Sequence, residues 1–383
     1  MCLNIAIMKR ILFVSILGLF TISVHSQQKI SLKDSLDQKL DLSDWVLEAN
    51  GFIPVPMLIT EPALGGIGGA LFGVFIDKNT PYTDTINGKV VKTRAKPNIY
   101  GVGGAYTANG TWFVGGMMMG VIKKWRANYR IGTAYADVNL KFYRQTELTG
   151  EKSFEFNLRS FPINAHLIKQ FGRSDWFAGL SYLFLNTELA RTNAEFHTPK
   201  EIKSIVSRLG ILVDYDGRDN IFTPDKGFRW NTLAAASSDV IGSYYEYESV
   251  NSALIGYVPI TPTLISGYRV EYQQVFGDFP FYIKPYINMR GIPAVRYQGE
   301  VTTLAETEWR WDITTRYSIV GFLGTAKALE DWSDFDNAPW RVSGGLGGRY
   351  LIARKLKLRM GLDVAHGPES WGYYIVLGSN WLR

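Results

Sequence analysis

The stretch from Asp216 to Trp230, DGRDNIFTPDKGFRW, combines side chains that accept hydrogen bonds, pair charges and fix the backbone. Its aspartates can accept hydrogen bonds from exposed backbone donors, and its first arginine can bridge carboxylates. The proline presets φ and the glycine permits a positive φ. This is the chemistry of a heavily stabilised turn in front of a new strand, and its residues are Asp216, Arg218, Asp219, Asn220, Pro224 and Gly227.

Residue types that carry reactions elsewhere lack the neighbours that catalysis requires. Cys2 is the only cysteine, so the mature chain has no thiol catalyst, disulfide framework or cysteine metal site. The run Gly65–Gly73 lacks the Lys-Ser/Thr ending of a phosphate loop and opens a strand. The histidines have neither metal-ligand spacing nor a nucleophile in a matching pattern. We therefore predict no enzyme, no cofactor and no metal site; the histidines are His25, His166, His197 and His366.

The N-terminus predicts a secretory signal peptide over residues 1–26. Lys9 and Arg10 form its basic region, Ile11–Val24 is apolar, and a small residue, Ser26, ends it. A membrane anchor is the alternative, but the apolar run is short for a span. Cleavage removes two positive charges and changes the net charge from +6 to +4. Without a basic cluster, that charge argues against a nucleic-acid partner.

The elements that would position the turn motif show alternation with a period of two. From Trp125 to Tyr135, with the exception of Thr133, and again from Leu356 to Val364, every second residue is apolar or aromatic. Such alternation places the two sets on opposite faces of a strand. A soluble sandwich alternates as well. Strands of roughly ten residues, short turns mixed with longer polar loops such as 78–96 and 328–339, and mixed charges on the polar face favour a membrane barrel. Every backbone group in lipid needs a partner, so such a sheet must close.

We predict an all-β protein, a transmembrane antiparallel β-barrel of about sixteen strands over residues 50–383. A pre-barrel periplasmic segment, residues 27–49, precedes it, with a short helix capped at Ser43-Asp44. An even number of strands places both ends of the barrel on one side of the membrane. The predicted strands are 66–77, 97–107, 110–122, 124–134, 136–146, 153–169, 174–188, 201–214, 227–239, 245–258, 264–276, 301–313, 316–327, 340–352, 355–366 and 372–381.

The turn motif resembles the D-x-R-D-N…P…G signature of the BamA/TamA family of outer-membrane insertases and translocases, also called the bacterial surface antigen family. In that family the signature joins two mid-barrel strands on the periplasmic side. The strand ranges above place this motif between the eighth and ninth strands, in agreement with the resemblance.

A second stretch, MRGIPAVRYQGE from Met289 to Glu300, resembles the V/L-R-G-F/Y lid-loop motif of the same family. The resemblance implies that this loop folds back into the barrel lumen and that its first arginine packs against acidic residues on the inner wall. Glu308 lies at the matching place on the next strand, and Glu306 lies two residues earlier on the same face. The lid-loop residues are Arg290, Gly291, Arg296 and Gly299.

Two positions depart from the family pattern. Ile292 stands where an aromatic residue is usual, and Gly324 stands where many members carry an acidic residue. The second carboxylate is therefore either absent or supplied by Asp363.

The C-terminal stretch YYIVLGSNW resembles the terminal β-signal of outer-membrane proteins, with alternating apolar and aromatic residues, a glycine and a final aromatic: Tyr373, Gly378 and Trp381. Most such chains end on the aromatic residue, whereas here Leu382 and Arg383 follow.

The resemblance covers roughly residues 50–381 and implies a barrel-only member, because residues 27–48 are too few for a POTRA domain. It predicts an outer-membrane protein that assists insertion or translocation of other outer-membrane or secreted proteins. A passive or gated pore, and a structural subunit of an envelope complex, are the alternatives. The expected partners are outer-membrane lipid, client proteins and the envelope assembly machinery.

Overall fold

The computed structural model describes residues 31–79, 82–86, 89–93, 97–146, 150–172, 174–192 and 202–381. The predicted signal peptide lies outside these residues. The chain consists of two compact units, Met1–Glu48 and Ala49–Arg383. The described part of the first unit contains one short helix, α2 (Ser43–Glu48). At its start, Asp41 Oδ1 accepts a hydrogen bond from the Ser43 amide at 2.7 Å.

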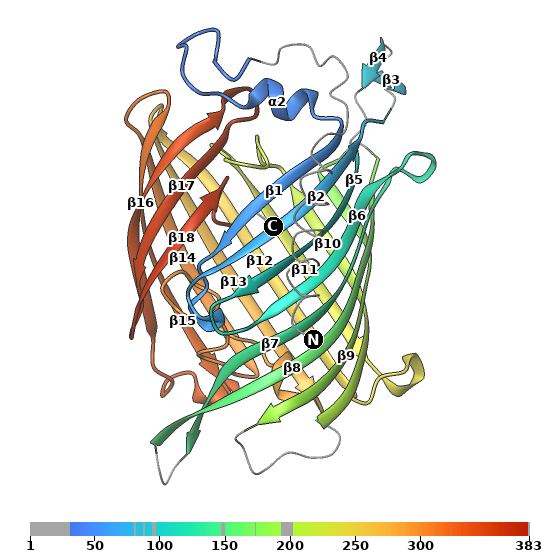
Figure 1. Cartoon of the computed structure of the whole chain (residues 1–383), viewed down its shortest axis with the longest axis vertical. Coiled ribbons are helices and arrows are strands. Elements are labelled where there is room, and N and C mark those ends of the chain that lie inside the picture. Colours follow the sequence, from blue (N-terminus) through green and yellow to red (C-terminus); the bar gives the residue numbers. More distant parts are fainter. Residues whose placement is uncertain are drawn as a thin grey trace, which may run out of the picture. The chain divides into compact units, whose positions relative to one another are not determined.

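The second unit is a single antiparallel sheet of sixteen strands that curls into a nearly closed barrel (Figure 1). Each strand pairs with its neighbours in the chain, so the predicted fold class and strand number are confirmed. The strands are β1 (Gly51–Ile59), β2 (Gly68–Asp77), β5 (Asn98–Thr107), β6 (Trp112–Ile122), β7 (Ala127–Thr146), β8 (Gly150–Gln170), β9 (Trp176–Thr192), β10 (Lys203–Asp216), β11 (Gly227–Ser237), β12 (Tyr247–Thr261), β13 (Leu264–Gly277), β14 (Val301–Asp312), β15 (Tyr317–Leu329), β16 (Arg341–Ala353), β17 (Leu358–His366) and β18 (Trp371–Leu377).

Short elements occupy the connections. A separate hairpin, β3 (Tyr82–Ile86) with β4 (Lys89–Thr93), lies between β2 and β5. The 3-10 turns are η2 (Pro62–Leu64), η3 (Lys123–Trp125), η4 (Asp239–Ile241), η5 (Phe281–Ile283), η6 (Trp332–Asp334) and η7 (Arg354–Leu356). No helix among the described residues is long and apolar enough to cross a membrane.

Two errors in the predicted strand ranges leave the total number of strands unchanged. β1 was missed because Pro54 and Pro56 argue against a strand, yet β1 pairs with β2 over its whole length. An edge strand tolerates proline because one of its edges needs no donors. Conversely, the predicted strands 124–134 and 136–146 are one strand, β7, whose register with β8 continues past Ala136. No glycine or proline stands at 134–136 to break it.

The order of the strands also assigns each connection to one end of the barrel. We call the end with the β10–β11 turn the turn end, and the end with the β13–β14 connection, residues 278–300 (the lid loop), the lid end. Each strand reverses direction, so the connection after β2 lies at the turn end. Of the two long polar loops noted in the sequence, 78–96 therefore joins strands at the turn end. The β15–β16 connection lies at the lid end.

Alternation separates the two faces of the barrel wall. On β14, Trp309 and Trp311 are 40% and 55% exposed on the outside, whereas Glu306 and Arg310 are 5% and 7% exposed. The outer face thus carries large apolar side chains and the inner face carries charges, as the period of two requires.

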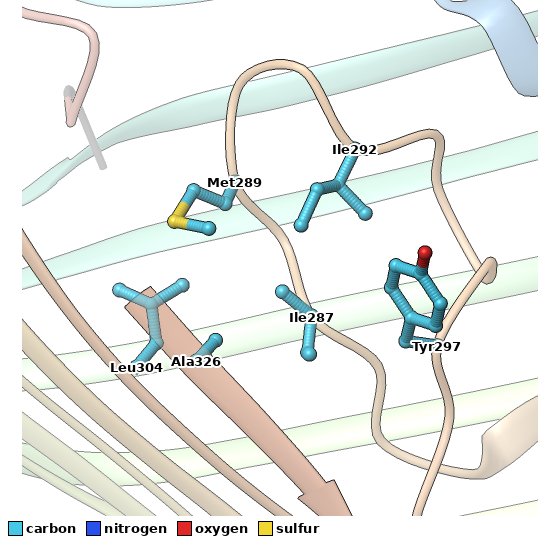
Figure 2. Packing of buried hydrophobic residues seen from close by; sticks show 6 residues of the cluster. All are labelled: Ile287, Met289, Ile292, Tyr297, Leu304 and Ala326. Atoms are coloured by element: carbon cyan, nitrogen blue, oxygen red, sulfur yellow. The ribbon is translucent and has the colours of Figure 1, made fainter. Parts of the chain in front are cut away.

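The lid loop fills the lumen near the lid end. Its apolar residues Ile287, Met289, Ile292 and Tyr297 point towards Leu304 of β14 and Ala326 of β15 (Figure 2). Its Phe281 ring meets the rings of Phe142 and Phe156, on β7 and β8, at centroid distances of 4.8 and 4.9 Å. Burial on both sides holds this loop inside the barrel.

Candidate functional site

Arg290 of the lid loop is the centre of a buried charge cluster. Its Nη1 donates a hydrogen bond to Asp363 Oδ2 of β17 at 2.6 Å. Its Nη2 lies 2.8 Å from Glu308 Oε2 of β14, an ion pair that is not aligned as a hydrogen bond. The guanidinium lies over the Phe322 ring of β15, 3.4 Å from its centroid. Three strands therefore hold one arginine, whose side chain is 3% exposed.

The second carboxylate at Arg290 comes from Asp363 of β17 and not from position 324 of β15. Asp363 is fully buried and also pairs with Arg349 of β16. Gly324 has no room for a side chain, because a Cβ there would lie 2.4 Å from Met289 Sδ and 2.5 Å from Glu306 Cγ. The glycine thus accommodates the methionine of the lid loop, and the acid comes from another strand.

Gly291 fixes the backbone beside this arginine. Its φ is +86°, and a Cβ would lie 2.5 Å from Ser343 Oγ, so both conformation and space require glycine. The Gly291 amide donates to the Tyr374 hydroxyl of β18 at 2.8 Å, and Ser343 Oγ donates to the Arg290 carbonyl. The loop backbone is therefore attached to β16 and β18.

Glu306 does not pair with Arg290, although it lies on the same face as Glu308. Its Oε2 accepts from Arg269 Nη1 of β13 at 2.6 Å and from the Trp381 indole N–H at 3.1 Å. Arg269 in turn pairs with Glu271. Glu306 therefore connects the wall to the C-terminus.

Arg296 and Gly299 attach the second limb of the lid loop. Arg296 pairs with Glu369 of the β17–β18 connection, and its guanidinium lies 4.0 Å from the ring centroid of Tyr143. Burial and the hydrogen bond to Glu369 raise the pKa of Tyr297 to about 12. Burial raises the pKa of Glu369, but Arg296 and Tyr297 outweigh it and hold that pKa below its ordinary value. A Cβ at Gly299 would lie 2.3 Å from the Leu329 carbonyl oxygen.

The turn motif is not an isolated turn. Arg218 clasps Asp216 through Nε and Nη2, both at 2.7 Å. Asn220 Oδ1 accepts from the Phe222 and Thr223 amides at 2.8 Å, and its Nδ2 donates to the Leu356 carbonyl of η7 at 3.0 Å. The turn thus reaches the connection between β16 and β17, more than 130 residues away.

Carboxylates of the turn bind the opposite wall. Asp219 accepts from the Asp225 and Lys226 amides and from Lys357 Nζ, at 2.9, 3.1 and 3.0 Å. Asp225 pairs with Arg310 and with Lys357. Burial raises the pKa of each aspartate, but these donors outweigh it, and both pKa values lie below the ordinary one. Pro224 is fully buried. Gly227, at φ +95°, would place a Cβ 2.2 Å from the Gly217 carbonyl oxygen.

The C-terminus differs from the predicted terminal strand 372–381. β18 ends at Leu377, and Gly378, at φ +77°, turns the chain inward. Trp381 is therefore 2% exposed inside the barrel, against Ile255, Tyr257 and Ile265, and is not the last residue of a strand. Of Tyr373, Gly378 and Trp381, only Tyr373 lies on the outer face of β18, 61% exposed. The Ser379 amide donates to the Phe222 carbonyl of the turn motif at 2.6 Å.

The arrangement pairs charges and positions chain segments. Among the described residues, no group of acidic, histidine or cysteine side chains could hold a metal ion. Sequence reasoning missed Phe322, Arg349, Tyr374 and the inward position of Trp381. Alternation along β15 places Phe322 on the inner face and could have identified it. The Gly-Ser-Asn run after Leu377 could have indicated the turn that brings Trp381 inward.

Comparisons with known proteins find the fold in solved structures. No protein-family model and no curated protein matches the sequence. The structure of BamA from Haemophilus ducreyi lacking POTRA domains 1-3 is similar with a TM-score of 0.58 at 12% identity, covering 86% of this chain and 70% of that one. CdiB from Escherichia coli is similar with a TM-score of 0.55 at 8% identity, covering 84% of this chain and 61% of CdiB. The chain thus has the sixteen-stranded fold of the BamA/TamA-type barrels.

Proposed function

We propose that the protein lies in the bacterial outer membrane. Large apolar side chains such as Phe52, Leu71 and Leu346, 60–69% exposed on the outer face, would be costly to leave in water and suit lipid. Paired arginines and carboxylates on the inner face suit a lumen that is partly hydrated. The predicted signal peptide would bring the chain to that membrane.

In that membrane the barrel assists insertion or translocation of other proteins, and the observation that carries this proposal is the seam between β1 and β18. Among the described residues, no backbone pairing joins these two strands. Proline has no backbone N–H. Because Pro54 and Pro56 lie two residues apart, both missing donors are on the same edge of β1. Since β1 keeps its register with β2 through both prolines, we assign the missing donors to the free edge.

A seam that is short of donors is easier to open than the rest of the sheet. Any strand that enters it finds backbone groups that need partners in lipid. The resemblance of the turn and lid-loop motifs to those of insertases and translocases supports the same activity. The filled lid end argues against a wide passive pore.

Site-specific photocrosslinking in living cells tests this proposal. A photoreactive amino acid replaces Leu58 on β1 or, as the matched control, Leu254 on β12; both face outward and are 66% and 44% exposed. We expect newly made outer-membrane or secreted proteins to crosslink at position 58 and not at position 254.

Other outcomes would redirect the assignment. Crosslinks to one abundant envelope protein at either position would indicate a structural subunit. An absence of protein crosslinks, together with steady conductance in planar bilayers, would contradict the proposal and favour the pore.

A further inference from the structure

The lumen contains a cavity of about 790 Å³, which we call the chamber. Its wall is formed by residues of β5 to β8 and β10 to β13 towards the turn end, and Ile221 and Phe222 of the turn motif contribute to it. Its volume lies within the range of roughly 300–1,000 Å³ that is usual for small-molecule sites.

Part of the chamber wall is apolar, whereas the lumen of a barrel is ordinarily polar. Register identifies two rows of side chains on the inner face: Val121, Asn128, Ile168, Leu212 and Leu233 in one, and Ile99, Met119, Arg130 and His166 in the next. All of these residues line the chamber. Apolar side chains that point into an open cavity have no packed partner, and a bound ligand would bury them.

The small residues of β9 and β10 explain why the chamber is open. Gly179 pairs with Ile168 on one side and Leu212 on the other, and Ser181 pairs with Gly210. A side chain at Gly179 would collide with the Leu167 carbonyl oxygen, at 1.9 Å from the Cβ. Gly179, Ser181 and Gly210 therefore leave space in the lumen beside Ile168 and Leu212.

Three of the four charged side chains at the chamber wall are paired, and Arg130 is the exception. The carboxylate of Asp214 is paired in two places with Arg229, at 2.9 Å each, and Glu271 is paired with Arg269. Arg130 forms no ion pair with the described residues, although its side chain lines the cavity. His166 lies directly opposite Arg130 on the next strand, and its Nδ1 is buried without a hydrogen-bond partner there.

From this juxtaposition we propose that the chamber binds an anionic amphiphile. Its single acyl chain lies against Ile168, Leu212 and Leu233, and its head group lies at Arg130 and His166. A carboxylate or a phosphate head fits these donors, so a free fatty acid and a phosphate-bearing lipid are the two sources. The proposal goes beyond protein insertion and does not depend on it.

Binding is measured on the folded barrel in nanodiscs of zwitterionic phosphatidylcholine. The probes share one chain length: hexadecanoate labelled with ¹³C at the carboxyl carbon, hexadecyl phosphate observed by ³¹P, and neutral hexadecanol as competitor. A head group bound in the chamber gives a resonance distinct from that of the bilayer-dissolved molecule and saturates with concentration.

Three variants locate the site. Arg130→Gln removes the unpaired charge and is expected to weaken anion binding by roughly ten-fold or more. Leu212→Trp fills the chamber and is expected to abolish binding of every probe. Lys124→Gln, on the exposed turn η3 outside the chamber, removes one charge as the matched control and is expected to leave binding unchanged. A heat-shift gel checks that each variant is folded.

Each outcome decides between supporting and overturning the proposal. Tighter binding of hexadecanoate than of hexadecyl phosphate points to a fatty acid, and the reverse order points to a phosphate-bearing lipid. Displacement by hexadecanol at the same concentration as by hexadecanoate overturns the anionic head group. Unchanged binding in folded L212W overturns the location, and the absence of a saturable resonance in the wild type overturns the site.

Discussion

The two sides of the lumen are built from strands with the same alternation, but one side is packed and the other surrounds a cavity. On the inner face of β13 to β17 (the charged wall) long side chains such as Arg269, Glu308 and Asp363 meet the lid loop and Trp381 in direct contact. On β5 to β8 and β10 to β12 towards the turn end, the corresponding side chains surround the chamber. Period and register are alike on both sides.

The difference lies in what occupies the inward positions. Arginine and glutamate span the gap to a partner and need that partner, because a lone buried charge is strongly unfavourable. Glycine, serine and medium aliphatic residues leave space and need none. One side of the barrel is therefore predicted to be sensitive to substitution and the other tolerant, which the following variants test.

Replacing Arg290 with alanine should give the largest effect. It leaves Asp363 and Glu308 buried with one fewer cation, which should lower the free energy of unfolding by about 3–5 kcal/mol. Arg130→Ala, on the chamber side, should change it by no more than about 0.5 kcal/mol, since no ion pair is lost. Urea titration of the refolding equilibrium measures both. Equal losses would remove the distinction between the two sides.

A pair of leucines makes the same comparison without charge. Leu304 is 6% exposed against Met289 of the lid loop, and its replacement with alanine should cost about 2–5 kcal/mol. Leu212→Ala enlarges a space that is already open, so no packed contact across the lumen is lost and the cost should be clearly smaller. The midpoint of thermal unfolding ranks the two variants. A larger loss for L212A would mean that the chamber wall is packed in solution.

The inward C-terminus gives an intermediate effect. Trp381→Phe keeps an aromatic ring between Tyr257 and Ile265 but removes the N–H that Glu306 accepts. Losing a hydrogen bond to a charged group should cost about 1.5–3 kcal/mol. The cost is measured by following unfolding with the circular dichroism of the backbone, which does not depend on Trp381. Quenching of Trp381 by brominated lipid, read against W381F, would contradict its inward position.

The turn motif should show the smallest effect, with a defined pH dependence. Asp219→Asn removes the charge that binds Lys357 and should cost about 1 kcal/mol or less at neutral pH. Because the pKa of Asp219 is held below its ordinary value of about 3.9, its contribution is present above that pH and is lost as pH falls through the folded-state pKa. The difference between D219N and the wild type should therefore shrink as pH falls through the folded-state pKa of Asp219 and vanish below it. A difference that persists there would assign the effect to something other than the Asp219 charge.

The fold could be predicted because strand period, strand length and turn chemistry are local properties. Sixteen strands and the place of the turn motif between the eighth and ninth follow from them, although β1 was missed and β7 was divided. Both errors arise where a tertiary effect overrides a local signal. An unpaired edge tolerates the prolines of β1, and pairing with β8 carries β7 through its middle.

The contacts between distant segments could be predicted only in part. Glu308 and Asp363 were named as partners of Arg290 through the resemblance, and the structure brings all three together. Glu306 instead meets Arg269, its direct register partner on the neighbouring strand β13, and Trp381, which the turn at Gly378 brings inward. Alternation gives the face of each side chain and says nothing about that pairing. The chamber likewise becomes visible only when the small residues of neighbouring strands are brought into register.

Hydrogen–deuterium exchange of the lid loop in the folded barrel is the most direct test that Arg290 holds this loop on the charged wall. In the wild type the amides of Ile287 and Gly299, which donate to the Tyr297 and Pro285 carbonyls, and that of Gly291 should be protected. Arg290→Ala should expose residues 285–299 to fast exchange, whereas Arg130→Ala should leave their protection unchanged. Slow exchange of the lid loop in R290A would contradict the account, because the loop would then be held by its apolar contacts alone.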